Sequence, residues 1–137
     1  MGVKLEEILD FVAEHSGKDS FKPNVDIELD LGVYGDDWHE MMSKFEKKFN
    51  VDMSTYLWYF HSGEEGFSSV GALFFKPPYA RVKRIPITPN DLLRIADNNI
   101  WDINYPAHDL PKRRYDLMIN TALMLGIFIY IIYWIVS

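Results

Sequence analysis

Apolar residues near the start of the chain recur at the spacing of a helix. They alternate with acidic residues, as on a helix with one buried face, and Gly17 then predicts a helix stop. The apolar positions are Leu5, Ile8, Leu9 and Val12. Between residues 18 and 34 this spacing is lost. The alternating Val25, Ile27, Leu29 and Leu31 predict an extended loop that holds apolar side chains against a helical bundle.

The clearest helical pattern covers residues 36–49. Its apolar stripe follows the order i, i+3, i+4, i+7 and i+11. The stripe consists of Trp38, Met41, Met42, Phe45 and Phe49. Asp36 and Asp37 stand in the first turn and Lys47 and Lys48 in the last, which suits the helix dipole at both ends. We therefore predict an amphipathic helix from Asp36 to Phe49.

Residues 53–86 show no single period. The run at 54–60 predicts a short helix begun by Ser54, and residues 61–69 predict a loop. The Pro-Pro pair at 77–78 separates two β-leaning runs, which favours a small β-hairpin. A well-marked helix follows, with Thr88 as N-cap, Pro89 as its first residue and Asp91 as the capping-box acid.

The chain ends in an apolar stretch, residues 117–136, that contains no charged side chain. At about 1.5 Å per residue it covers roughly 30 Å, the thickness of a bilayer core, so we predict a transmembrane helix. Lys112, Arg113 and Arg114 precede it and no cation follows, which places this flank on the cytoplasmic side. The predicted organisation is a cytoplasmic domain at 1–111, a basic flank at 112–116 and a tail anchor at 117–136.

This organisation predicts a single-pass protein of the inner, cytoplasmic membrane, with its N-terminal domain in the cytoplasm. The lipid bilayer is then one partner. Ala122 and Gly126 form a small-xxx-small pair on the span, which would allow a homodimer through helix pairing.

Charge and composition narrow the function further. The net charge is −6, and residues 1–111 alone hold 11 Lys and Arg against 19 Asp and Glu, a net of −8. An acidic domain argues against nucleic-acid binding, which needs cations for the phosphates. The chain has no cysteine, which excludes disulfides, thiolate metal sites and cysteine nucleophiles.

The spacing of the acidic and histidine residues does not match known metal-binding or catalytic motifs. A calcium loop begun at Asp26 would put Leu31 at the glycine position, and one begun at Asp30 would put Met41 at the last ligand. His39-Glu40 continues to Ser43 where a zinc motif requires histidine. The four histidines are scattered with no ligand spacing, so we place each at the surface or at the boundary of the core. We expect no metal, no cofactor and no enzyme activity; a ligand-binding or enzymatic role for the 53–86 segment is the third, weaker hypothesis.

Residues 30–49 resemble the segment of acyl carrier proteins that surrounds their prosthetic-group serine. Asp30, Leu31 and Gly32 match the start of that segment, and Asp37 and Glu40 match its acids. The helix at 88–101 is similar to the last helix of the family, with the Ile-Thr start at 87–88. The resemblance covers most of residues 3–51 and 86–101 and implies a small helical bundle.

The same resemblance contradicts acyl-carrier activity. Gly35 stands at the position of the serine, so no oxygen is present to carry phosphopantetheine. Asp36 follows where the family has leucine, and residues 53–86 make the connection to the last helix longer than usual. The segment is also similar to small uncharacterised bacterial proteins with Gly-Asp-Asp at this position, a family of unknown function.

We therefore predict a mainly α fold: a small acyl-carrier-like bundle with a long irregular insertion, plus one transmembrane helix. The leading hypothesis is a non-catalytic, tail-anchored membrane protein that docks or regulates another protein. Asp36, Asp37 and Glu40 would form the docking face for a partner with a basic patch. The alternative is a small membrane-complex subunit that acts through its transmembrane helix.

Overall fold

The computed structural model describes residues 2–65 and 70–137. Within these ranges the chain forms six α-helices, two 3₁₀ helices and no β-strand. In chain order they are α1 (Leu5–Ser16), α2 (Ile27–Leu31), α3 (Asp36–Phe49), η1 (Trp58–Phe60), α4 (Val70–Phe74), η2 (Pro78–Ala80), α5 (Pro89–Asn98) and α6 (Tyr115–Val136). The predicted mainly helical fold is therefore confirmed.

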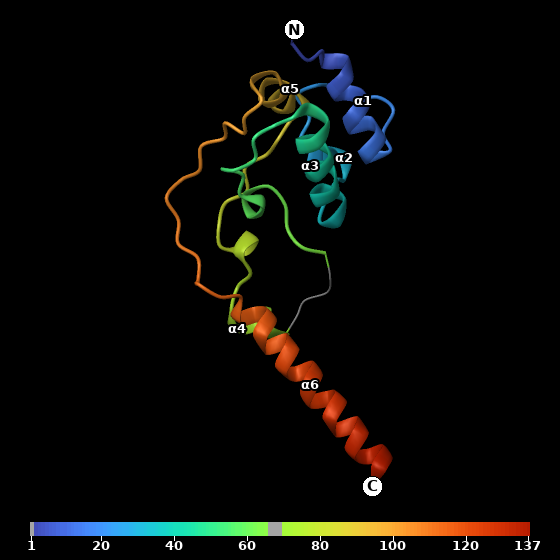
Figure 1. Cartoon of the computed structure of the whole chain (residues 1–137), viewed down its shortest axis with the longest axis vertical. Helices are drawn as coiled ribbons and strands as arrows, with labels where there is room; N and C mark the ends of the chain where they lie inside the picture. Colours follow the sequence, from blue (N-terminus) through green and yellow to red (C-terminus); the bar gives the residue numbers. More distant parts are fainter. Residues whose placement is uncertain (1, 66–69) are drawn as a thin grey trace.

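Helices α1, α3 and α5 pack together at the end of the molecule that lies away from α6 (Figure 1). Their shared core includes Ile8, Phe11, Phe45 and Leu92, all 2% exposed or less. All five apolar residues of the predicted α3 stripe are buried. Each helix ends at a residue in the left-handed conformation, with Gly17 after α1, as predicted.

Helix α5 begins with the predicted capping box. The Asp91 N–H donates to the Thr88 hydroxyl at 3.1 Å, and the Thr88 N–H donates to the Asp91 carboxylate at 2.9 Å. These two bonds satisfy backbone donors that no helical carbonyl can reach.

The extended loop predicted for residues 18–34 is partly wrong. Residues 27–31 form α2, because the Asp26 side chain accepts from the Leu29 N–H at 3.2 Å and so caps a short helix. In this helix Ile27 and Leu31 are buried, whereas Leu29 is 69% exposed and does not pack against the bundle.

The predictions for residues 53–86 are also corrected. Ser54 caps no helix; its N–H donates to the Asp52 carboxylate, and the helical residues are the 3₁₀ turn η1. The predicted hairpin is wrong, since α4 and η2 occupy its two arms. The prolines at 77–78 lack N–H donors, and Pro78 starts the 3₁₀ turn instead of a strand. Residues 66–69 of the predicted loop lie outside the described residues.

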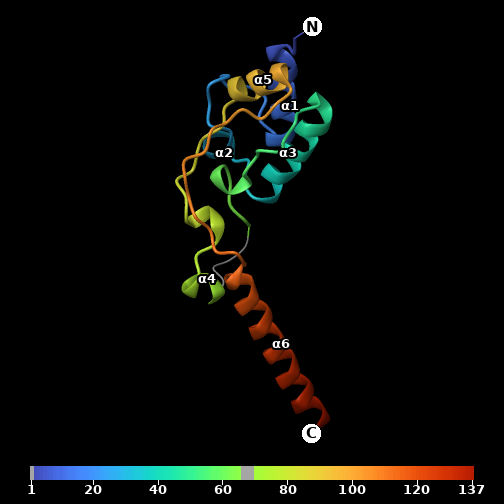
Figure 2. The ribbon, with the colours of Figure 1, turned by 60° about the vertical axis from the view of Figure 1, so that its left-hand side comes forward.

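Helix α6 extends away from the rest of the chain in both views (Figures 1 and 2). It starts two residues before the predicted span, and it is long and apolar enough to cross a membrane. None of its apolar window is buried. Helix α4 lies beside its first turns, and residues 99–114 run as an irregular segment from α5 to its start.

Candidate functional site

The predicted docking residues lie together at the start of α3. Asp36, Asp37 and Glu40 are all exposed. Glu40 pairs with Lys44 one turn later at 2.8 Å, and the hydrogen bond to Lys44 lowers the pKa of the Glu40 carboxyl. Asp36 and Asp37 make neither an ion pair nor a side-chain hydrogen bond with the described residues. Two free carboxylates are thus presented on a helix whose other face is fixed in the core.

Gly35, the N-cap of α3, has a conformation that few other residues adopt. Its φ is 62° and its ψ is −124°, a combination that favours glycine strongly. The residue is buried, and its N–H donates to the Ser62 hydroxyl at 3.1 Å. A Cβ placed here would overlap the side chain of Glu65. Residue 35 is therefore part of a covered backbone turn.

Residues 62–65 provide this cover. The Tyr34 hydroxyl donates to the Glu64 carbonyl at 3.3 Å, and a Cβ on Gly63 would overlap that hydroxyl. The 53–86 segment is consequently not an appended loop: its middle part lies directly against the start of α3.

A buried polar network fixes the same segment from the other side. His61 is 1% exposed, so its predicted position at the surface or at the boundary of the core is wrong. Its Nδ1 lies 2.9 Å from the Ile85 carbonyl, and its Nε2 lies 2.7 Å from the Tyr105 hydroxyl. That hydroxyl also accepts from the Trp101 indole N–H at 2.7 Å and from the Leu57 N–H at 3.3 Å.

These contacts define one protonation state for His61. A carbonyl only accepts, so Nδ1 carries the hydrogen, and Nε2 accepts from the Tyr105 hydroxyl. The neutral ring thereby satisfies both nitrogens. Burial lowers the pKa of His61 to about 4, since a charged ring would lose its hydration and meet no carboxylate in hydrogen-bond contact.

Arg84 links the end of the 53–86 segment to α2. Its guanidinium donates to both carboxylate oxygens of Asp26, at 3.1 and 2.6 Å. Burial alone would raise the pKa of Asp26, but the bonds to Arg84 and the backbone lower it overall. For neighbouring Glu28 burial prevails and the pKa rises, because Arg84 is 3.8 Å away.

The three cations of the predicted basic flank differ in burial and in their partners. Arg114 is half-buried and pairs with Glu64 and with Asp116, each at 2.7 Å, whereas Lys112 and Arg113 are exposed. Glu64 thus connects the cover of α3 to the start of α6.

Helix α4 packs closely on the same end of α6. The Gly71 N–H donates to the Asn120 side chain at 2.8 Å, and a Cβ on Gly71 would overlap the Asp116 carbonyl. Phe75 contacts Tyr115, with ring centroids 5.3 Å apart. Asn120, one of the polar side chains inside the predicted span, therefore has a partner in α4.

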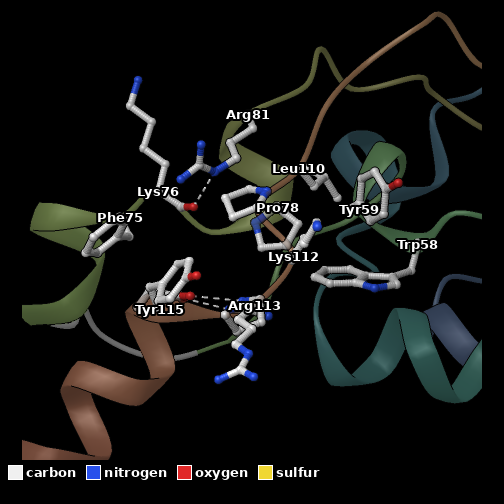
Figure 3. A pocket seen from close by; sticks show the side chains of 13 residues that line it. Trp58, Tyr59, Phe75, Lys76, Pro78, Arg81, Leu110, Lys112, Arg113 and Tyr115 are labelled. Carbon is white, nitrogen blue, oxygen red and sulfur yellow. Dashed lines mark hydrogen bonds and ion pairs between the residues drawn. The ribbon is translucent and has the colours of Figure 1, made fainter.

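A pocket of about 290 Å³ lies at this junction (Figure 3). It is lined by η1, by residues 75–81 and by residues 110–116, which include five cationic side chains and one carboxylate. We call it the basic pocket. Lys112, Arg113 and Arg114 were expected near the membrane from their place in the sequence, whereas Lys76 and Arg81 were not. A signal was present, since residues 76–84 hold four cations and no acid in an acidic domain.

The predicted helix-pairing residues lie farther along α6. Ala122 and Gly126 are exposed, and a Cβ on Gly126 would meet no atom within 4 Å. This surface is open to a second helix. In the part of the chain that the structure describes, no group of three His, Cys, Asp or Glu side chains is placed to hold a metal ion.

A family model described as "Protein of unknown function (DUF1493)" matches residues 5–88, which is more than half of the chain. The match begins with α1 and ends at the N-cap of α5, so it includes the start of α3 and the whole 53–86 segment. No curated protein and no solved structure matches the chain. These findings support the predicted likeness to an uncharacterised family and supply no link to acyl carrier proteins. The chain belongs to the DUF1493 family of proteins of unknown function.

Proposed function

We propose that the protein is a non-catalytic, membrane-anchored docking module. Its soluble body would bind or regulate another protein through Asp36, Asp37 and Glu40. The observation that carries this proposal is the pair of exposed, unpartnered carboxylates in the first turn of α3, on a helix held by five buried apolar side chains. A basic patch on a partner would meet preorganised charges, and opposite charges across an interface increase both specificity and association rate.

The resemblance to acyl carrier proteins supports a docking role without acyl transfer. The position that resembles the prosthetic-group serine in sequence is Gly35, which is buried under residues 62–65. Intact-mass measurement after co-expression with a phosphopantetheinyl transferase tests this part. We expect an unmodified mass, and a gain of the prosthetic-group mass would refute it.

Membrane anchoring places the docking face near the bilayer. Helix α6 would cross the inner membrane with residues 1–111 in the cytoplasm, because the basic flank directly precedes it. Tyr34 contacts Glu64, and Glu64 pairs with Arg114 at the start of α6. The start of α3 is therefore coupled to the membrane end of the body, so the expected partner is itself close to the membrane.

Cross-linking of the full chain in membranes, read by mass spectrometry, tests the docking face. The test variant changes Asp36, Asp37 and Glu40 to Lys. The matched control changes Glu6, Asp10 and Glu14, exposed acids of α1, to Lys with the same change of charge. Loss of a cross-linked protein in the test variant alone supports the proposal. Equal cross-linking in both variants refutes it.

The second candidate function is a membrane-complex subunit that acts through α6. The open surface around Ala122 and Gly126 favours it. Replacement of residues 117–136 by a poly-Leu span separates the two functions. Retained partner binding favours docking by the body, whereas loss of binding favours the span.

A further inference from the structure

The basic pocket is placed where a membrane phosphate would be, provided that α6 crosses the bilayer as proposed. Residues 112–116 directly precede the span, and they line the pocket. Phosphate groups of lipids lie just outside the hydrocarbon core, at the level of such a flank. Cationic clusters at this position attract anionic headgroups.

The charges of the pocket are available to a ligand. Its only carboxylate, Asp116, is already paired with Arg114. Within the described residues Lys76, Lys112 and Arg113 have no carboxylate partner, and neither does Arg81. The Arg81 Nε–H donates to the Lys76 carbonyl at 2.7 Å, which orients the guanidinium; its terminal nitrogens make no hydrogen bond with residues 2–65 or 70–137.

Figure 3 shows how these side chains are arranged. Lys112 lies close to the middle of the pocket, whereas the Arg81 guanidinium lies at its edge and turns towards the Lys76 carbonyl. The side chains of Lys76 and Arg113 extend to opposite sides. Phe75 and Tyr115 border one end and Trp58 the other. Aromatic rings beside cations are typical of the interface between membrane and water. A phosphate in the pocket would meet Lys112 near the middle and Arg81 from the edge, and the outer cations would reach neighbouring headgroups.

Helix α4 gives independent evidence for contact with lipid. Its Gly71 bonds to Asn120, about 6 Å along the helix from Asp116, so α4 lies at the depth of the first turn of the span. At that depth Leu73 and Phe74 are 79% and 70% exposed. Large apolar side chains beside a span are stable when they enter the interface of the bilayer. The pocket, directly above α4, then faces the headgroups.

From this geometry we propose that the basic pocket binds the phosphate of an anionic phospholipid, with Arg81 and Lys112 as its main ligands and Leu73 and Phe74 inserted beside it. The recognised chemistry is a phosphate ester. Soluble phosphate esters share it, but the exposed apolar pair and the adjoining span favour a lipid. The proposal assigns no role to the docking face of α3.

The test uses the full chain in nanodiscs with equal amounts of phosphatidylcholine and phosphatidylglycerol. Native mass spectrometry after release counts the lipids that stay bound. The test variant is Arg81→Ala with Lys112→Ala. The matched control is Lys18→Ala with Lys47→Ala, which removes two exposed cations elsewhere. A third variant, Arg81→Lys, keeps the charge.

We expect the protein to retain phosphatidylglycerol in preference to phosphatidylcholine. The test variant should lose this preference by on the order of tenfold, since each surface cation contributes a few-fold in affinity for anionic lipid. The control and Arg81→Lys should retain most of it. Equal retention of both lipids, or an unchanged preference in the test variant, overturns the proposal.

Two further measurements distinguish a wrong ligand from a wrong membrane assignment. Millimolar glycerol phosphate in the buffer should not displace the lipid, and displacement would identify a soluble phosphate ester as the ligand and overturn the lipid assignment. Alkaline carbonate extraction tests the span itself. Release of the protein from membranes refutes the proposed anchoring, whereas firm retention without lipid preference refutes the pocket alone.

Discussion

Acid should destabilise the folded part of the chain that precedes α6, through His61. The folded protein holds this ring neutral, with a pKa of about 4, whereas an unfolded histidine has a pKa near its ordinary value of 6.5. Between these two values the unfolded chain binds more protons than the folded one. Stability therefore rises with pH in this window, and it is lost as the pH falls from 6.5 towards 4.

The magnitude follows from the difference between the two pKa values. One pKa unit corresponds to about 1.4 kcal/mol, so the complete loss is about 3 kcal/mol, and about 2 kcal/mol is already lost at pH 5. A domain of this size is stable by roughly 5–15 kcal/mol, so the change is readily measured. The two tyrosines that contact His61, Tyr56 and Tyr105, do not contribute to this change in stability. Burial raises the pKa of both, so neither titrates in this pH window.

Urea unfolding of the full chain in mild detergent, followed by tryptophan fluorescence between pH 4.5 and 7.5, measures the effect. His61→Gln removes the titrating ring. Since all carboxylates remain in both proteins, the difference between the two stability curves isolates His61. NMR titration of the ring gives the folded pKa directly. A parallel pair of curves, or a ring pKa at or above 6.5, would refute the reasoning.

Three substitutions test other parts of the structure. Gly35→Ala should lower the unfolding free energy by about 1–3 kcal/mol, because alanine must adopt a strained backbone conformation. Gly17→Ala, at φ 70° and with no atom within 4 Å of the added Cβ, should lower it by about 1 kcal/mol. Equal losses would contradict the role given to residue 35. Gly71→Ala should separate α4 from α6, because the added Cβ would overlap the Asp116 carbonyl. Hydrogen exchange would report the separation as lost protection of the residue 71 amide, which donates to Asn120. Unchanged protection would mean that the two helices are not in contact. Arg84→Met should lower the unfolding free energy by about 1–2 kcal/mol, because the half-buried Asp26 carboxylate loses its partner. The same change should raise the pKa of Asp26, which NMR titration measures. An unchanged pKa would show that the pair is not formed.

The local features were predictable because their causes lie within a few residues. The α3 stripe has the helical period, and its ends match Asp36 and Phe49 as predicted. The capping box of α5 needs only residues 88 and 91. The missed helix α2 had a local signal as well, an Asp26 N-cap and Gly32 as its stop, but the alternating apolar residues were given more weight.

The 53–86 segment was predicted poorly because its structure depends on distant partners. A Pro-Pro turn between β-leaning runs is locally compatible with a hairpin, yet a strand pair needs mutual packing. Here the first arm packs on α6 through Gly71, and the second joins η1, where the Ile85 N–H donates to the Phe60 carbonyl at 2.6 Å. Such contacts leave no periodic signal in the sequence.

Residue order alone is enough to predict the helices of the bundle, the absence of a serine at residue 35 and the apolar length of α6. Each follows from residue chemistry or from spacing along the chain. The tertiary structure decided that residues 62–65 cover Gly35, that His61 is buried against Ile85 and Tyr105, and that η1, residues 75–81 and the basic flank meet in one pocket. Polar groups 24 or more residues apart become partners only when the surfaces that carry them pack together, and that packing depends on the whole chain.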